Sequence, residues 1–227
     1  MDPSFRLMSV NLLHERSDVD RFAQVLDELA PDVVVAQELA PAPADVLAER
    51  YPNHRLRPAT DYSGRGIATR LDATFDDIPM PGRVGISASV AVGSRTVRVA
   101  GVHFLNPVKF PWWPMIAGRR RQLDALLRWA DAGLGPTVVA GDFNASPSWP
   151  LYKRLAERFA DLVAEHKTSQ GERPERTWSW RPGWPRMLRI DHVFGVGVSV
   201  FDSLVVPISG SDHRAVIVDV ALSSTGA

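Results

Sequence analysis

The chain has 227 residues, a formal net charge of zero and a hydrophobic content of 45%. That hydrophobic content is sufficient for the core of one sizeable globular domain. A protein that holds nucleic acid non-specifically usually carries a basic surplus, so here such affinity would depend on a local patch, of which residues 119–121 are the densest. The absence of cysteine excludes disulfides, thiolate zinc sites and cysteine nucleophiles.

No apolar run is long enough to span a bilayer, and the first residues lack the basic and apolar regions of a signal peptide. We therefore expect a soluble protein, cytoplasmic as the chain is written, and a monomer. No linker, low-complexity segment or repeat divides the chain. Residues 1–222 are expected to form a single domain, followed by a disordered tail at 223–227.

The first half of the chain alternates short β-prone runs with amphipathic segments, and turn residues separate them. The elements predicted there are a strand at 5–10, a helix at 18–29, a strand at 33–37, a helix at 44–49, a loop at 52–64, and strands at 66–70, 74–78, 86–92 and 95–102. The last two strands meet at Gly93-Ser94, which predicts a hairpin.

The second half begins with residues 105–116, which contain three prolines and are predicted to be irregular. The elements predicted after them are a helix at 118–130, a strand at 137–140, a helix at 150–157, a polar and Trp-rich loop at 166–189, and strands at 190–194, 198–205 and 215–221. This order predicts a mixed α/β layout with helices outside two packed sheets.

Four β-prone runs end at a residue that can bind a metal or move a proton, namely Asn11, Glu38, His103 and the segment 141–144. In an α/β protein the ends of buried strands can converge on one edge of a sheet, where ligands gather. A carboxylate, an amide and an imidazole at such an edge are the parts of a hard-metal phosphate site. The alternative for each is an ordinary strand end without function, because polar residues are common wherever a strand turns or reaches solvent.

Asp142 and Asn144 form the most informative pair. They lie two residues apart in an extended segment, so their side chains face the same side. Gly141 would let the backbone approach a ligand closely. Asp142 could hold or deprotonate a water molecule, and Asn144 could donate to a phosphoryl oxygen.

Two acid–histidine pairs follow late in the chain, Asp191-His192 and Asp212-His213. An aspartate that accepts from one imidazole nitrogen fixes the tautomer and favours the cation, which makes His213 a candidate for catalysis. The alternative is an ordinary surface pair. His192 should point away from the face of Asp191 and is interpreted as structural. The remaining histidines outside the strand ends, His14, His54 and His166, are given no part in the site.

These motifs occur in a fixed order along the chain: Val10-Asn11, Gln37-Glu38, His103-Phe104, Gly141-Asp142-Phe143-Asn144, Ile190-Asp191-His192-Val193-Phe194 and Ser211-Asp212-His213. In that order they resemble the endonuclease/exonuclease/phosphatase superfamily over nearly the whole length. The superfamily includes DNase I-like nucleases, AP endonucleases, inositol polyphosphate 5-phosphatases and neutral sphingomyelinases. The resemblance implies a four-layer α/β sandwich of DNase I type, with two packed mixed β-sheets flanked by helices.

The resemblance also implies a divalent-metal phosphoesterase. Asn11 and Glu38 would hold Mg²⁺ or Mn²⁺, with Asp212 as a nearby or second-site ligand. Asp142 would orient and deprotonate the attacking water, and Asn144 would contact the phosphate and help to position the nucleophile.

The same resemblance gives roles to the histidines. His213, paired with Asp191, would stabilise the phosphorane-like transition state. His103 would contact the phosphate or assist the leaving group. Arg119 begins a segment that resembles the family's Arg-x-x-Gln helix start.

The substrate stays open, and it is expected to be a phosphodiester or a phosphomonoester. Aromatic side chains near the site could stack on bases, contact a lipid surface or cap the core. The candidate substrate contacts are Trp112, Trp113, Arg119 and Thr177. We expect first a nuclease-type phosphodiester hydrolase for nucleic acid or a nucleotide, using metal-assisted in-line attack of water. The alternatives are a lipid or inositol-phosphate phosphoesterase whose Trp112-Trp113 loop meets a membrane, and a non-catalytic binding module.

Overall fold

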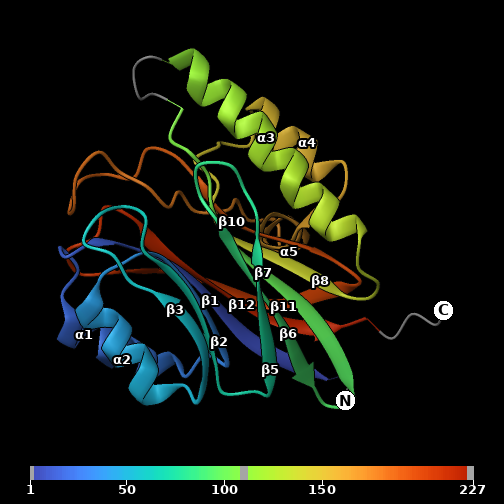
Figure 1. Cartoon of the computed structure of the whole chain (residues 1–227), viewed down its shortest axis with the longest axis horizontal. Coiled ribbons are helices and arrows are strands. Elements are labelled where there is room, and N and C mark those ends of the chain that lie inside the picture. Colours follow the sequence, from blue (N-terminus) through green and yellow to red (C-terminus); the bar gives the residue numbers. More distant parts are fainter. Residues whose placement is uncertain (1–2, 108–111, 224–227) are drawn as a thin grey trace.

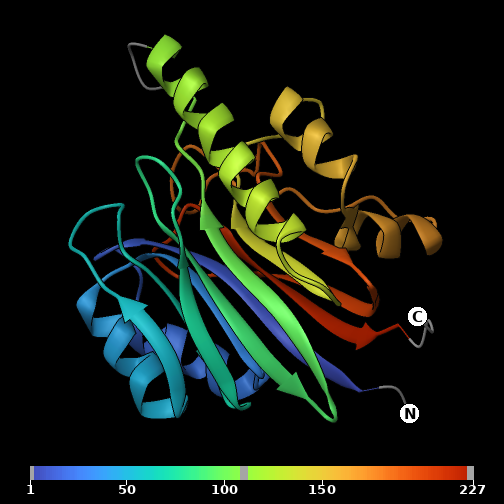
Figure 2. The same cartoon turned by 45° about the vertical axis from the view of Figure 1, so that its right-hand side comes forward.

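Two six-stranded sheets pack face to face in the computed structural model, which describes residues 3–107 and 112–223. Helices lie on the outer side of each sheet, so the molecule has four layers (Figures 1 and 2). The predicted α/β sandwich with two mixed sheets is therefore confirmed. Within the described residues, no helix is long and apolar enough to cross a membrane.

The first sheet has the strand order β11-β12-β1-β2-β4-β3. Only β1 and β2 run parallel, and α1 connects them. The helices α1 and α2 pack on the outer face of this sheet, where Phe22 and Leu47 join a cluster with Val34 and Ile217. The strands are β1 (Ser4–His14), β2 (Val33–Leu39), β3 (Asn53–Arg57), β4 (Arg65–Thr69), β11 (Val198–Pro207) and β12 (Arg214–Leu222), and the helices are α1 (Val19–Leu29) and α2 (Pro41–Arg50).

The second sheet has the strand order β5-β6-β7-β8-β10-β9. Here β7 and β8 run parallel, and α3 connects them. The outer face carries α3 and α4, with Leu126 and Leu155 packed in a cluster with Val139 and Phe194. The elements are β5 (Ala73–Ile78), β6 (Gly85–Val92), β7 (Arg95–His103), β8 (Thr137–Asp142), β9 (Ala160–Asp161), β10 (Asp191–Val196), α3 (Trp112–Asp131), α4 (Pro150–Ala156) and α5 (Leu162–Ser169).

The central strands β1, β2, β7 and β8 are covered on both faces, so most of their residues are buried, and β2 and β8 carry the near-continuous apolar runs typical of such strands. Between the sheets, Leu7 and Val35 of one sheet share a cluster with Val99 and Val138 of the other. Since β1 and β2 are parallel, as are β7 and β8, the carboxyl ends of each pair lie at one edge of their sheet. The polar residues that end these strands are brought together by this arrangement.

Three sequence predictions need correction. Residues 112–116 are helical although residues 105–116 were expected to be irregular, because Pro114 lies in the first turn of α3, where a backbone N–H has no helical partner. The predicted loop at 52–64 contains β3, an edge strand that pairs only with β4. The start of the predicted loop at 166–189 belongs to α5, whose amino terminus is capped by the Asp161 side chain accepting from the Ala164 backbone N–H.

Candidate active site

One row of the second sheet carries three buried ionisable side chains. His103 ends β7 and lies opposite Asp142, the last residue of β8. Asp191, the first residue of β10, lies opposite Asp142 on its other side. All three side chains are buried. Parallel and antiparallel pairing therefore place two carboxyl groups and an imidazole side by side at one edge of the sheet.

The first sheet contributes Asn11 and Glu38 to the same place. The Asn11 amide nitrogen lies 3.3 Å from Asp142 Oδ2 and 3.4 Å from Glu38 Oε1. The Asn11 oxygen accepts from the backbone N–H of Leu13 at 3.0 Å. Asn11 thus connects a carboxylate of each sheet by donating to both, whereas the oxygen proposed as a metal ligand already has a partner. Its role as a ligand stays a prediction.

The backbone is strained around these residues. Among the described residues, five that are not glycine have a positive φ, and they include Leu13, His14, Glu38 and Asn144. The fifth, Ala30, caps the end of α1. Left-handed backbone costs most residues about 1–2 kcal/mol, and such strain gathers at functional sites. At Glu38 and Asn144 this backbone conformation sets the direction of the side chains.

Gly141 was expected to let a ligand approach the backbone, but in the structure it lets a neighbouring strand approach. A Cβ atom at this position would lie 1.9 Å from the carbonyl oxygen of Val102 in the neighbouring strand. Its φ of 148° also falls where side chains are rarely tolerated. Gly141 therefore permits close approach of β7 to β8, which is what sets His103 beside Asp142.

His213 forms a buried ion pair with Asp191. Its Nδ1 lies 2.9 Å and 3.0 Å from the two Asp191 carboxylate oxygens. Burial by itself would lower the His213 pKa, but the Asp191 carboxylate outweighs it and raises that pKa to about 10. His213 is therefore a cation at neutral pH, and its Nε2 lies 3.9 Å from Asp142 Oδ2 and 4.0 Å from Asp212 Oδ1.

Asp142 is held by Asn144. The Asn144 backbone N–H donates to Asp142 Oδ1 at 2.7 Å, and its side-chain amide donates to Oδ2 at 3.1 Å. Burial raises the pKa of Asp142 above that of an ordinary aspartate, while the His213 cation opposes this rise. A carboxylate with a raised pKa in a polar site is suited to accept a proton from water.

His103 has the opposite electrostatic setting. Burial and the Arg83 guanidinium hold its pKa well below the usual histidine range, so the imidazole is neutral. Arg83 Nη1 lies 2.5 Å from His103 Nδ1. The same Nη1 lies 3.3 Å from Nε2, and because arginine only donates, the nearer Nδ1 is the better acceptor, which favours the tautomer with its hydrogen on Nε2. That Nε2 lies 3.4 Å from Asp142 Oδ2 and 3.8 Å from Glu38 Oε1.

Sequence reasoning missed Arg83 and His14. Arg83 lies in the loop between β5 and β6, and it also donates to the Tyr62 carbonyl oxygen at 2.6 Å. No motif marks it, because only the folded loop brings it to His103. His14 Nε2 lies 3.0 Å from Glu38 Oε2, so this histidine, which was expected to lie apart from the site, contacts one of its residues. Its place three residues after Asn11, at the end of the same strand, was an available signal.

Several carboxylate oxygens at the site fit a hard divalent cation. Asp212 Oδ1 is buried and has no hydrogen-bond partner among the described residues, and the contact of Glu38 Oε2 is the His14 imidazole at 3.0 Å. A buried carboxylate oxygen without a partner is costly unless a cation compensates it. The carboxylates of Glu38, Asp142, Asp191 and Asp212 share the site with the cationic Arg83 and His213, and Arg119 and Arg186 also act electrostatically on Asp142 and on Asp191 and Asp212. Carboxylate oxygens are the donors that Mg²⁺ and Mn²⁺ prefer.

A second grouping could also hold a metal ion by spacing alone. Asp142, Asp191 and His213 offer ligand atoms within 4.8 Å of one another. However, His213 is protonated and its Nδ1 is paired with Asp191, and a metal ligand must be deprotonated. Glu38 and Asp212 therefore remain candidate ligands beside this grouping.

Other candidate residues support the site from behind. Arg119 is buried and donates to the carbonyl oxygens of Leu105, Phe143 and Asn144, which fixes the segments that follow β7 and β8. Thr177 Oγ1 accepts from the backbone N–H of Asp191 at 3.2 Å. As substrate contacts both stay predictions. The side chains of Trp112 and Trp113 lie outside the described residues, although the helix itself begins at Trp112.

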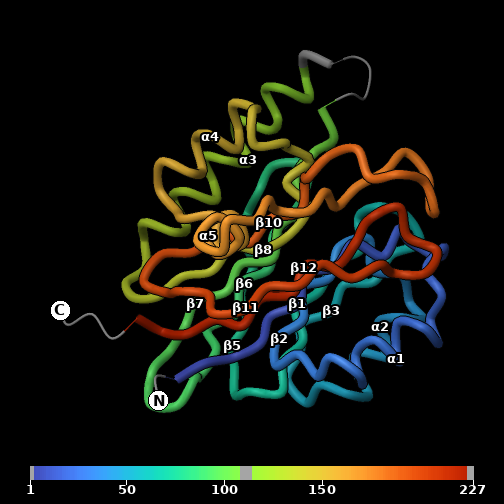
Figure 3. The backbone as a smooth tube through the Cα atoms, turned by 180° about the vertical axis from the view of Figure 1, so that it is seen from behind, coloured from blue at the N-terminus to red at the C-terminus, as the bar shows by residue number. Residues whose placement is uncertain are grey.

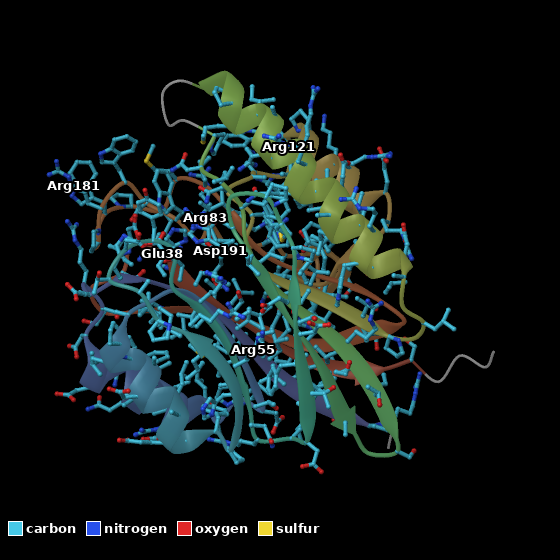
Figure 4. The ribbon with its side chains drawn as sticks, in the orientation of Figure 1. Glu38, Arg55, Arg83, Arg121, Arg181 and Asp191 are labelled. Atoms are coloured by element: carbon cyan, nitrogen blue, oxygen red, sulfur yellow. The ribbon has the colours of Figure 1, made fainter. Side chains whose placement is uncertain are left out.

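His192 is structural, as expected. Its Nε2 lies 2.8 Å from the Ala145 carbonyl oxygen, and its Nδ1 lies 3.4 Å from Asp161 on the side away from the catalytic row. Figure 4 shows Glu38, Arg83 and Asp191 gathered at one end of the sandwich, whereas Arg121 lies on α3 away from them.

The spatial cluster repeats the motif order that the sequence displays. A model of the Endonuclease/Exonuclease/phosphatase family matches residues 8–213. The chain belongs to this family. Among curated proteins, no match to the chain was found.

Solved structures support the fold of the endonuclease/exonuclease/phosphatase family. An endonuclease/exonuclease/phosphatase from Beutenbergia cavernae aligns with a TM-score of 0.74 and 22% identity, over 97% of this chain and 72% of that one. The human Nocturnin catalytic domain aligns with a TM-score of 0.71 and 19% identity, over 98% and 96%. A humanized D. rerio TDP2 gives 0.75 and 19%, over 96% and 98%. At these identities the likeness supports the four-layer fold alone.

Proposed function

We propose that this protein is a Mg²⁺- or Mn²⁺-dependent phosphodiester hydrolase of nuclease type that works by in-line attack of water. The observation that carries the proposal is the arrangement around Asp142. A buried carboxylate with a raised pKa has a cationic imidazole on one side, a neutral imidazole on the other, and the carboxylates of Glu38 and Asp212 near those imidazoles. A base, a cationic stabiliser, a neutral donor and a metal set are the parts that phosphoryl transfer needs.

The metal would be held by Glu38 and Asp212, and its chemistry would be to neutralise the phosphate and the leaving oxygen. Asp142 orients a water molecule and accepts its proton as the new phosphorus–oxygen bond forms and the bond to the leaving oxygen breaks. Asn144 keeps Asp142 in place through two hydrogen bonds. Its left-handed backbone, which asparagine tolerates, directs the amide toward Asp142.

His213 and His103 would act on the phosphoryl oxygens. The His213 cation, fixed by Asp191, stabilises the negative charge that develops there. His103 contributes the Nε2 hydrogen, because Arg83 occupies Nδ1. Its low pKa makes it a hydrogen-bond donor to phosphate in preference to a proton donor for the leaving group.

The decisive test is hydrolysis of bis-p-nitrophenyl phosphate and p-nitrophenyl phosphate with Mg²⁺, Mn²⁺, Zn²⁺ or EDTA. We expect the diester to be hydrolysed with Mg²⁺ or Mn²⁺ and activity to be lost with EDTA. Full activity in EDTA, or activity that only zinc restores, would contradict the metal assignment. Turnover of the monoester alone would contradict diester cleavage.

A further inference from the structure

The segment that leads from α5 into β10 is attached to the active site at its base. Trp178 forms single bridges with Leu188 and with His213. The Trp178 indole N–H donates to Asp212 Oδ2 at 3.1 Å, and the Ser179 backbone N–H donates to the Asp212 carbonyl oxygen at 3.0 Å. Figure 3 shows this segment beside the turn between β11 and β12 that carries Asp212. We call residues 178–188 the tryptophan loop.

The tip of the tryptophan loop exposes large apolar side chains. Trp180 is 62% exposed, Trp184 is 53% exposed and Met187 is 53% exposed. These are three of the eight large hydrophobic residues that are exposed in the described part of the chain, and they come from eleven consecutive residues. Scattered single exposures need no explanation, but a cluster beside a reactive centre marks a binding surface.

The same tip carries positive charge without a partner. The Arg181 guanidinium lies over the Trp184 ring at 5.6 Å from its centroid, and no ion pair of the described residues includes Arg181. The two carboxylates just before the loop are occupied, since Glu172 pairs with Lys167 and Glu175 pairs with Arg214. The loop therefore offers aromatic faces together with an uncompensated cation, which suits a ligand with flat rings and phosphates.

We propose that the tryptophan loop is a stacking platform for an unpaired base of single-stranded nucleic acid, next to the phosphodiester held at Asp142 and His213. This proposal rests on the proposed function and names its substrate. Trp180 and Trp184 stack on bases, and Arg181 contacts the backbone phosphate. Bases of an intact duplex stack on each other and cannot reach these rings, so single strands are preferred.

A membrane surface fits the loop less well. A membrane-inserting loop separates its apolar tip from the charges that remain at the interface. Here Arg181 lies between the two exposed tryptophans in sequence and directly over one of the rings. Burying Trp184 in lipid would therefore carry the guanidinium with it. A stacked base, in contrast, uses a ring face and leaves the cation in water beside a phosphate.

The test compares the Trp180→Ala/Trp184→Ala double variant with wild type on a single-stranded oligonucleotide and on bis-p-nitrophenyl phosphate. The ratio of kcat/KM for the oligonucleotide to that for the small diester should fall by about 10-fold or more, mainly through KM. The matched control is Phe201→Ala, which removes a 59% exposed ring on β11 and should leave the ratio unchanged. Arg181→Ala should reduce the dependence of oligonucleotide KM on salt.

An unchanged ratio in the double variant overturns the proposal. So does an equal loss on both substrates with a lowered melting temperature, since the rings would then be structural. Binding of wild type to anionic phospholipid vesicles that the double variant loses, with oligonucleotide kinetics unaltered, would assign the loop to a membrane instead.

The platform can be tested separately from catalysis. Quenching of tryptophan fluorescence by the oligonucleotide is measured in Asp142→Asn, with and without the loop substitutions. If wild type hydrolyses no phosphodiester, the proposed function fails, but loop-dependent quenching would still support the platform. If wild type is active and quenching is independent of the loop, only the platform fails.

Discussion

The surroundings of His213 and of His103 make an informative comparison, because two buried imidazoles lie within 4 Å of the same Asp142 oxygen. His213 lies just before β12 and faces the Asp191 carboxylate, whereas His103 ends β7 and faces the Arg83 guanidinium. The pKa of His213 rises to about 10, while that of His103 falls well below its usual range. Burial lowers the pKa of both rings, so the difference between them comes from their charged neighbours, which are carboxylates led by Asp191 at His213 and chiefly the Arg83 guanidinium at His103.

The largest effect should come from removing the carboxylate that the two histidines share. Asp142→Asn preserves the shape and removes the base, so kcat should fall at least ~10²-fold. Asp45→Asn, at an exposed position of α2, is the matched control and should behave like wild type. Steady-state kinetics on the diester, with circular dichroism to verify folding, provide the measurement. Near-wild-type turnover would remove Asp142 from the mechanism.

Asp191→Asn should convert the charged histidine into one resembling His103. We expect kcat at pH 7 to fall ~10²-fold, because His213 loses its cation. In wild type the folded His213 pKa of about 10 exceeds the unfolded value. The pair therefore stabilises the fold fully below about pH 6.5, and this contribution is lost as pH rises through about 10.

Urea unfolding of wild type and Asp191→Asn checks this linkage. The difference in free energy of unfolding should be large at pH 6 and should shrink as pH approaches 10. A difference that does not change with pH would show that the ion pair is not what raises the His213 pKa.

Glu38→Gln tests the side of the site where His103 and His14 meet a carboxylate. An amide keeps the shape but removes the charge that attracts the cation, so the metal titration midpoint should rise by at least ~10-fold. Glu49→Gln, on the exposed side of α2, is the control. A fall in kcat at saturating Mg²⁺ with no shift of the midpoint would show that Glu38 is not a ligand.

The smallest effect is expected from Arg83→Met. Without the guanidinium, His103 Nδ1 is free to carry the hydrogen, and kcat should fall about 10-fold as the donor at Nε2 is lost from part of the population. Arg83→Lys retains a donor and should recover part of the activity. Nitrogen-15 chemical shifts of His103 report the tautomer directly. An unchanged tautomer in Arg83→Met would show that Arg83 does not set it.

Most of the residues in this comparison could be predicted from the sequence. Apolar runs that stop at Asn11, Glu38, His103 and Asp142 predict strand ends, and parallel pairing explains why such ends meet. The Asp191–His213 pair was expected from the motifs and is present at 2.9 Å. These predictions succeed because each depends on a buried strand, and a run of consecutive apolar residues in the sequence marks such a strand.

Other features of the structure were not predicted from the sequence. Arg83 comes from a loop with no periodicity, and its contact with His103 exists only after β5 and β6 have paired. Pro114 was interpreted as a helix breaker, although a proline is tolerated in the first helical turn. Arg119 is predicted to contact the substrate, but its position in the sequence could not reveal that it also donates to three backbone carbonyl oxygens behind the site.

The left-handed backbone of Glu38 bears on the history of the chain. Asparagine tolerates this conformation, so Asn144 is little penalised, but a glutamate at φ 49° reduces the stability of the fold. In a lineage that kept this architecture only as a scaffold for docking, drift toward glycine at that position would be favoured because it relieves the strain. The glutamate at this position therefore costs folding stability, which we expect only where its carboxylate has a function such as the metal binding proposed above.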